Sequence, residues 1–366
     1  MLELREAART VGGETHIHPL SLKLERGSLN VLLGAALSGK TSLMRLMAGL
    51  DRPTSGSVWF DGKDVTGVPV RKRDIAMVYQ QFVNYPAMSV YDNIASPLKL
   101  QGRPRAEIEA EVRKAADLLR LTPYLSRKPL ELSGGQQQRT AIARAVVKGA
   151  DLVLLDEPLA NLDYKLREEL REELPKIFAA SGAIFVYATT EPAEALLLGG
   201  ATAVLHEGRL AQFGPTMEVW RRPRDLTVAR AFADPPLNML EARKEGGLLL
   251  EGEAAFSPVP PHLSAAPDGP CRLAFHPHHL TLAPKGPQDL RLETTVDLAE
   301  IAGSETFIHV ERGLQRWALL APGVHEIAPG TPLAGFLDPA RLMAFDAQGR
   351  AVAAAETSAQ SLVRGG

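Results

Sequence analysis

The most constraining feature of the sequence is a short apolar run that leads directly into a glycine-rich loop. The run is Leu29–Leu33, and the loop GAALSGKT at residues 34–41 fits the pattern G-x-x-x-x-G-K-[ST]. Such a run is typical of a buried strand, so we expect a helix to begin near Lys40. Backbone N–H groups there would converge on phosphate oxygens, with Lys40 neutralising charge and the Thr41 hydroxyl reaching Mg²⁺. The alternative is a glycine turn with a surface lysine.

A second apolar run ends in two acidic residues. Leu152–Leu155 suits a parallel strand covered on both faces, and Asp156 and Glu157 follow at its C-terminal end, where ligands bind in such sheets. Asp156 would hold Mg²⁺ through a water, and Glu157 would act as a base on the attacking water. Taken alone, this pattern also fits a strand that runs into a solvated loop. The glycine-rich loop disfavours that alternative.

A third motif, LSGGQQQR at residues 132–139, stands just before the second run. Ser133 can cap a helix that continues through Val146 to a stop at Gly149. The free N–H groups of its first turn would form a second anion site. A serine–glycine cap without a ligand is the alternative.

Together the three motifs resemble those of the ABC transporter ATPases. In that family the serine-capped helix faces the glycine loop of a partner subunit, so two ATP molecules lie between two chains and a lone chain is a poor ATPase. The resemblance implies ATP and Mg²⁺ as cofactors, with the metal held by Thr41, Gln80 and Asp156. It assigns ATP contacts to Gly34, Ala35, Ala36, Leu37, Ser38, Gly39, Lys40, Thr41, Ser42, Gln80, Asp156 and Val11, and contacts with the partner's ATP to Ser133, Gly134, Gly135, Gln136 and Asp163.

Two further segments match the family by resemblance only. Residues 78–82 (VYQQF) resemble the Q-loop, in which Gln80 touches Mg²⁺ and the following residues face a membrane subunit. Residues 160–163 (ANLD) resemble the D-loop, which crosses to the partner chain. Without the resemblance, Gln80 would be taken for a surface glutamine.

The switch segment departs from the family pattern. VYATTE at residues 186–191 aligns with a segment that usually ends Thr-His-Asp, so Thr190 stands in place of the histidine that contacts the γ-phosphate. Threonine cannot carry a positive charge or relay a proton at neutral pH. Loss of a positioned acid–base group costs about 10²–10⁴ in rate. We therefore expect a weakened site, unless a water or a neighbouring residue compensates.

Two other departures lie in the same half of the site. Val11 occupies the position at which the family stacks an aromatic residue on adenine, and His16 is a possible substitute. Leu37 replaces the usual central glycine of the loop, and a leucine does not adopt a positive φ cheaply, so we expect the loop to be altered there.

Because Ser133 to Gln136 and Asp163 are intact, we hypothesise an asymmetric ATPase pair. A different chain, which carries the histidine, would use this chain's serine-capped helix. The combination resembles the ATPase subunits of carbohydrate and polyol importers, especially glycerol importers with two distinct ATPase chains. The implied partners are a second ATPase chain (non-identical, or a second copy), two membrane-spanning permease subunits and, indirectly, an extracytoplasmic substrate-binding protein. The alternatives are a non-hydrolysing structural subunit that only completes the partner's site, and an ABC ATPase of repair or translation.

The composition limits where such a chain works. A net charge of −2 gives no argument for nucleic acid or for binding to anionic lipid. No apolar stretch approaches the roughly 20 residues that span a bilayer, and the N-terminus lacks the pattern of a signal peptide. One cysteine, Cys271, excludes an internal disulfide. We expect a peripheral protein on the cytoplasmic face of the inner membrane, attached through protein partners.

Alternating strand and helix patterns predict an α/β P-loop domain over residues 1–235, with a helical subdomain at about 84–135. Two prolines after Asp234 mark its end. Beyond them, frequent proline and glycine with short strand-like runs at 272–275, 294–298, 306–310 and 317–320 predict an all-β domain over 236–350. By resemblance this is an OB-like regulatory domain. The small, polar tail 351–366 is expected to be disordered.

Overall fold

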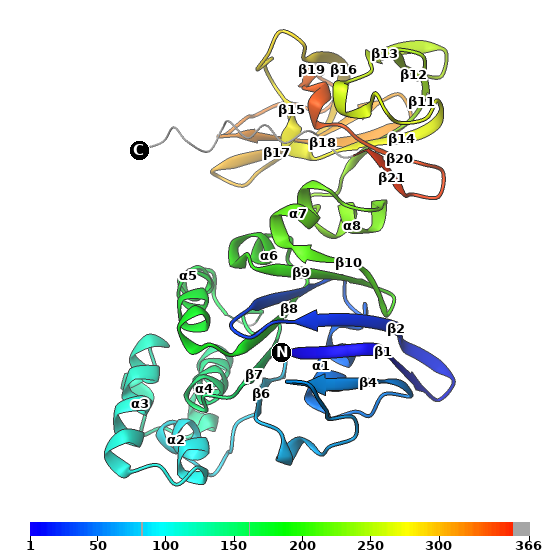
Figure 1. Cartoon of the computed structure of the whole chain (residues 1–366). Coiled ribbons are helices and arrows are strands. Elements are labelled where there is room, and N and C mark those ends of the chain that lie inside the picture. Colours follow the sequence, from blue (N-terminus) through cyan, green and yellow to red (C-terminus); the bar gives the residue numbers. More distant parts are fainter. Residues whose placement is uncertain (82, 161, 354–366) are drawn as a thin grey trace. The chain divides into compact units, whose positions relative to one another are not determined.

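The computed structural model describes residues 1–81, 83–160 and 162–353. The chain divides into two compact units, Met1–Thr216 and Met217–Gly366 (Figure 1). The sequence placed the boundary later, at the prolines after Asp234. Helix α8 (Leu226–Ala231) accounts for the difference, because its Leu226 and Ala229 pack into an apolar cluster with Phe345 of the second unit.

The first unit contains two sheets. In the larger sheet the order is β10-β9-β3-β8-β7-β6; β10 is antiparallel to β9, and the other neighbours are parallel. The smaller sheet is antiparallel, in the order β2-β1-β4-β5. The strands are β1 (Leu2–Val11), β2 (Glu14–Leu24), β3 (Leu29–Leu33), β4 (Ser55–Phe60), β5 (Lys63–Asp64), β6 (Ile75–Val78), β7 (Leu152–Asp156), β8 (Ile184–Thr189), β9 (Ala201–His206) and β10 (Arg209–Pro215).

The central strands are apolar along their whole length because both faces are covered. All residues of β7 and β8 are buried. The expected strands at 29–33 and 152–155 are present as β3 and β7, and β4 and β5 form a hairpin with its turn at Asp61 and Gly62. Side chains of both sheets and of helix α1 (Lys40–Ala48) form one core, which includes Leu4, Leu32 and Met44.

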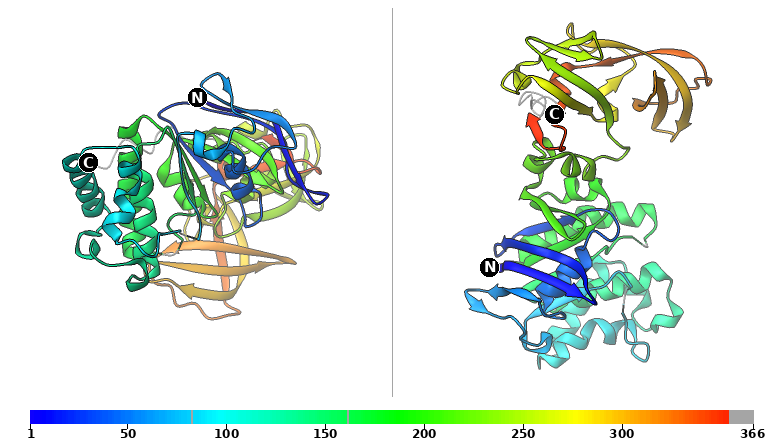
Figure 2. Two further views of the ribbon diagram at one scale, coloured as in Figure 1. Left: turned by 90° about the horizontal axis from the view of Figure 1, so that it is seen from below. Right: turned by 90° about the vertical axis from the view of Figure 1, so that its right-hand side faces the viewer.

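Helices α2, α3 and α4 gather on the side of the first unit away from the small antiparallel sheet (Figures 1 and 2). They pack on one another, and α3 buries Ile108, Val112 and Ala115, as its helical spacing predicts. The helices of the chain are α1 (Lys40–Ala48), α2 (Val90–Leu100), α3 (Arg105–Leu118), α4 (Gly134–Val147), α5 (Tyr164–Ser181), α6 (Pro192–Leu198), α7 (Thr216–Arg221) and α8.

The second unit carries two antiparallel sheets over one apolar core. Their orders are β13-β12-β11-β14-β20-β21 and β15-β19-β16-β17-β18. Leu240 and Leu273 of one sheet and Ile308 of the other belong to the shared core. The strands are β11 (Asn238–Glu245), β12 (Leu248–Glu251), β13 (Ala254–Pro258), β14 (Gly269–Phe275), β15 (Leu280–Thr281), β16 (Leu290–Ile301), β17 (Glu305–Arg312), β18 (Gln315–Pro322), β19 (Pro332–Leu337), β20 (Met343–Phe345) and β21 (Ala351–Ala353).

The predicted fold class is thereby confirmed: an α/β domain with a phosphate-binding loop, followed by an all-β, OB-like domain. The prediction for the tail is wrong for residues 351–353, which pair with β20 as β21, and its other residues lie outside the described part. Within the described residues, no helix combines the length and apolar character needed to cross a bilayer.

Candidate nucleotide site

The glycine-rich loop joins β3 to α1 at the C-terminal edge of the parallel sheet. Helix α1 begins at Lys40, as expected, and Gly39 before it has φ 101° and no side-chain cap, so the first-turn N–H groups remain available to an anion. A Cβ on Gly34 would lie 2.3 Å from the carbonyl oxygen of Leu205. The Ser38 hydroxyl is buried and has no hydrogen-bond partner among the residues that the structure describes. These features fit a phosphate cradle.

Leu37 departs from expectation in an informative way. The sequence suggested that the loop would be altered where leucine replaces glycine, but Leu37 takes the left-handed conformation itself, with φ 65°. Its side chain is 100% exposed. A left-handed L-residue costs about 1–2 kcal/mol. The loop therefore keeps its backbone path at the expense of local strain.

The charged and polar groups of the loop and of the β7 edge bind one another. Lys40, only 5% exposed, donates from Nζ to the carbonyl oxygens of Gly34 (2.8 Å) and Ala35 (2.9 Å) and lies 3.8 Å from Glu157 Oε1. Thr41 Oγ1 donates to Asp156 Oδ2 (2.8 Å). The hydroxyl and carboxylate that the sequence assigned to Mg²⁺ are thus adjacent.

Gln80 joins the same group of residues. It follows β6, and its Nε2 donates to Glu157 Oε2 at 3.1 Å. Since β6 and β7 are parallel neighbours, their C-terminal ends deliver these two side chains to one edge of the sheet. An oxygen set of threonine hydroxyl, aspartate carboxylate and glutamine amide matches the hard oxygen ligands that Mg²⁺ prefers.

Burial perturbs the ionisable groups of this site. It lowers the pKa of Lys40, against the opposing charges of Glu157 and Asp156. It raises the pKa of Asp156, against the hydrogen bond from Thr41, and it raises the pKa of Glu157, against the charge of Lys40. A carboxylate with a raised pKa is a better proton acceptor, which suits Glu157 to the base role.

A cavity of about 770 Å³ opens over the loop. Thr190 lines it together with Lys40 and Glu157, so the residue at the switch-histidine position does lie at the site. Of the residues predicted from the sequence, those that line it are Ala36, Leu37, Gly39, Lys40, Thr41, Ser42, Gln80, Glu157 and Thr190. Gly34, Ala35 and Asp156 reach this group through the hydrogen bonds given above.

Val11 is not one of the described residues that line the cavity. It ends β1, where it pairs with Glu14 in the turn to β2, and it is 44% exposed. His16, the suggested substitute, does line the cavity, with Glu14 and Thr15 beside it. This part of the cavity wall therefore carries the imidazole of His16 and the carboxylate of Glu14, and the expected position of an adenine-stacking aromatic residue is not part of it.

Glu207 and Gly208, at the turn between β9 and β10, form a second wall of the cavity that was not predicted from the sequence. Gly208 N–H donates to the Ser38 carbonyl (3.0 Å), and a Cβ on Gly208 would lie 2.4 Å from the His16 carbonyl oxygen. The one local signal was the glycine after Glu207. The pairing of β9 with β3, which brings this turn to the loop, has no signature in the sequence.

The predicted second anion site has the expected local structure. Ser133 caps α4: Gln136 N–H donates to Ser133 Oγ (3.4 Å), and Ser133 N–H donates to Gln136 Oε1 (3.0 Å). Asp163 caps α5 by accepting from the Leu166 N–H (3.1 Å). In the described part of the chain, neither Asp163 nor the 133–136 segment lines the cavity over the glycine loop. Asn161, named with Asp163, lies outside the described residues.

Comparison with known proteins places this geometry in a family. Residues 17–160 match the family model described as ABC transporter. The alpha-glucoside transport ATP-binding protein AglK of Rhizobium meliloti (strain 1021) is 34% identical over 358 residues, which cover 95% of this chain and 98% of that protein. This chain belongs to the ABC transporter ATPase family.

Other relatives of this ABC ATPase include two import proteins. The sn-glycerol-3-phosphate import ATP-binding protein UgpC of Cupriavidus pinatubonensis (strain JMP 134 / LMG 1197) is 34% identical, covering 95% of this chain and 97% of its own. The trehalose/maltose import ATP-binding protein MalK of Thermococcus litoralis (strain ATCC 51850 / DSM 5473 / JCM 8560 / NS-C) is 42% identical over 71% of this chain and 72% of its own. Among solved structures, the dimeric ATP-binding cassette MJ0796 bound to ADP and Pi matches with a TM-score of 0.54 and 26% identity, covering 59% of this chain and 99% of that one.

Proposed function

We propose that this ABC ATPase is the ATP-binding subunit of an importer for a carbohydrate or polyol, with glycerol as the specific candidate. The observation that carries the proposal is the phosphate cradle with Lys40 and Glu157 at its base. Relatives along nearly the full length of the chain are named as ATP-binding proteins of alpha-glucoside transport and of sn-glycerol-3-phosphate import. A peripheral position on the membrane, through protein partners, follows from that role.

The residues divide the work as follows. Lys40 and the first-turn N–H groups of α1 bind the phosphates of ATP. Thr41, Asp156 and Gln80 hold Mg²⁺, which supplies charge neutralisation at the phosphates when bound. Glu157 orients water and accepts its proton. The Ser133-capped end of α4 and Asp163 act on the nucleotide of a second ATPase chain.

We further propose that the second chain is not identical to this one. Thr190 lines the cavity without a group that can ionise, whereas the cap at Ser133 is complete. A chain that carries histidine at the equivalent of position 190 would then hydrolyse ATP more quickly in its own site while using this chain's α4 cap. The rival is a chain that retains ATP and never hydrolyses it, which the well-placed Glu157 argues against.

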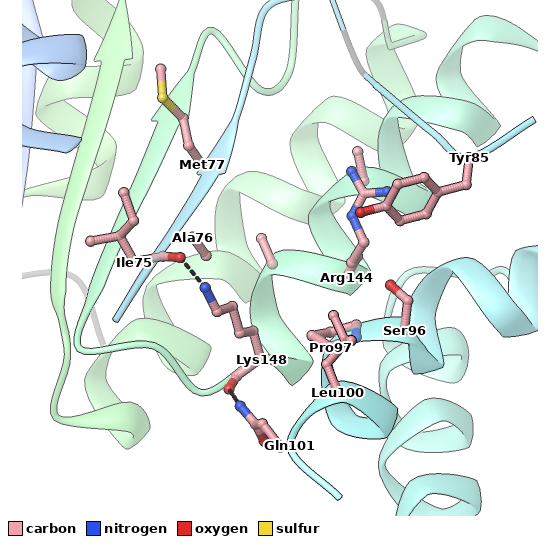
Figure 3. Close-up of a pocket in the computed structure, with 12 residues that line it drawn as sticks. Ile75, Ala76, Met77, Tyr85, Ser96, Pro97, Leu100, Gln101, Arg144 and Lys148 are labelled. Carbon is pink, nitrogen blue, oxygen red and sulfur yellow. Dashed lines mark hydrogen bonds between the residues drawn. The ribbon is translucent and has the colours of Figure 1, made fainter. Parts of the chain in front are cut away.

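A groove beside the sheet suits the membrane partner. It has a volume of about 390 Å³ and lies between β6 and helices α2 and α4 (Figure 3). Two of the residues that line it, Met77 and Tyr85, stand close to Gln80 in the sequence. Arg144 lies over the ring of Tyr85 at 4.9 Å, and Lys148 reaches the Ile75 carbonyl. We propose that a short segment of a permease subunit, with carboxylate or terminal carbonyl oxygens facing Arg144, occupies this groove.

The test is reconstitution with the permease subunits in lipid vesicles and measurement of ATP-dependent uptake. Lys40→Ala should abolish the part of the ATPase that this site contributes, whereas Lys63→Ala, on the exposed edge strand β5, serves as the control. Uptake of labelled glycerol rather than maltose or glycerol 3-phosphate is expected. Efficient turnover by the purified chain without a second ATPase chain would refute the non-identical pair.

A further inference from the structure

A network of charged residues, of which Glu194 and Arg171 are largely buried, binds the two residues that flank Thr190 in the sequence. The carboxylate of Glu194 on α6 is 5% exposed, and its Oε2 accepts from Tyr187 Oη (3.0 Å) and Thr189 Oγ1 (2.6 Å). Its other oxygen faces Arg171 of α5, with Nη2 at 3.2 Å and Nε at 3.4 Å. Burial of a carboxylate is costly unless it is paired, and here it is paired on both oxygens.

Arg171 also holds the residue on the other side of Thr190. Its guanidinium, on a side chain 11% exposed, donates to Glu191 as well as to Glu168. The Glu191 N–H in turn donates to Thr189 Oγ1 at 3.0 Å. Both neighbours of Thr190 are therefore tied to one guanidinium, Thr189 through Glu194 and Glu191 directly.

A second arginine extends the network to the segment before α5. Arg167 donates from Nη1 to Glu191 Oε1 (3.0 Å) and from Nη2 to the carbonyl oxygens of Ala160 and Leu162, both at 3.4 Å. Glu191 is thus bound by Arg167 and Arg171 together. Glutamate has one methylene more than the aspartate usual at this position, and in this chain it spans both guanidinium groups.

We propose that Arg171 is a positioning residue that fixes Thr190 at the nucleotide cavity, and that Glu191 links this switch segment to Ala160 and Leu162. A rigid link of charge-assisted hydrogen bonds transmits a shift at one end to the other. Nucleotide bound over Thr190 would then change the mobility of residues 160 and 162, which lie next to Asp163, and contacts made at Asp163 would act back on Thr190.

Hydrogen exchange of the full chain, read by mass spectrometry in peptides over 157–166 and 184–196, tests this with and without Mg-ATP. In Arg171→Met, exchange in the 184–196 peptide should rise about tenfold while the β3 and β6 peptides stay unchanged. Arg171→Lys should restore part of the protection. Arg113→Met, which removes an exposed arginine paired with Glu109 on α3, is the matched control and should change neither peptide.

A second variant, at Glu191, distinguishes the proposed link to residues 160 and 162 from a general loss of stability. Glu191 is 41% exposed, so Glu191→Gln should fold normally, bind Mg-ATP with unchanged affinity, and lose the ATP-dependent change in the 157–166 peptide. Retention of that change in Glu191→Gln would overturn the link. An equal rise across all strands in Arg171→Met, or none in the 184–196 peptide, would overturn the positioning role.

Discussion

Under the proposed function, replacing Thr190 by histidine should increase the rate of ATP hydrolysis at this chain's own site. Thr190 is exposed and lines a cavity of about 770 Å³, so an imidazole displaces no core side chain there. The backbone on both sides is already held, by the Glu157 N–H bond to the Ala188 carbonyl (3.0 Å) and by the bond between Glu191 and Thr189. We therefore expect a change of no more than about 0.5 kcal/mol in the free energy of unfolding.

The gain in rate follows from what threonine lacks. A positioned acid–base group contributes about 10²–10⁴ in rate, equivalent to roughly 3–5 kcal/mol of activation free energy. The assay is ADP formation in a single turnover by the assembled transporter, with the partner chain's own site inactivated by a glutamate-to-glutamine change at its equivalent of Glu157. Thr190→Gln is the control, since glutamine fills similar space and cannot ionise at neutral pH.

Either of two results would contradict a catalytic role for the histidine. If Thr190→His leaves the single-turnover rate of this site unchanged while its melting temperature is also unchanged, the missing imidazole does not limit hydrolysis. If Thr190→Gln gains as much as Thr190→His, the effect is one of shape rather than of proton transfer.

Three further predictions concern stability and charge. Because burial raises the pKa of Glu157, its charged form destabilises the fold. Glu157→Gln should therefore raise the melting temperature at pH values above the ordinary glutamate pKa and leave it unchanged at pH values below it. Single-turnover hydrolysis should fall about 10²-fold or more. Leu37→Gly should not destabilise the chain, since relief of the left-handed backbone offsets the extra unfolded-state entropy of glycine; a drop of several degrees by calorimetry would contradict this. The hydrogen bond from Arg26 and, second, that from the amino terminus lower the pKa of Asp61 to about 2. The melting temperature of Asp61→Asn should therefore lie below that of wild type above pH about 4, and the two should converge as the pH falls to about 2.

The strand–loop–helix unit and the cap at Ser133 could be predicted because each is a local structure. The residues that determine the backbone conformation and those that hydrogen-bond its N–H groups are neighbours in the sequence, so a short motif is enough to predict the structure. The same holds for α1, which begins at the expected Lys40, and for β7 with its two acids.

The walls of the cavity could not be predicted in this way. Glu207 reaches the site because β9 pairs with β3, which is some 170 residues away, and no local pattern encodes that pairing. Val11 was assigned by counting back along the chain from Ser21 and Leu22, and its contact with adenine stays a prediction; the structure places Val11 at the end of β1, beside the turn to β2. The boundary between the two units lies at Thr216 rather than near residue 235, because the apolar side chains of α8 pack against residues after 236. The two prolines give no sign of this tertiary contact.

The hydrogen bonds that Lys40, Thr41 and Gln80 donate within the site have a consequence for the energetics of nucleotide binding. Nucleotide entry is an exchange reaction. Lys40 must release the carbonyl oxygens of Gly34 and Ala35 before it can donate to phosphate, and the two carboxylates must release the Thr41 hydroxyl and the Gln80 amide before metal and water take their place. The heat of ATP binding should therefore be much smaller than a count of new contacts suggests. Because internal hydrogen bonds already hold the loop before nucleotide binds, the loop should lose little conformational entropy on binding.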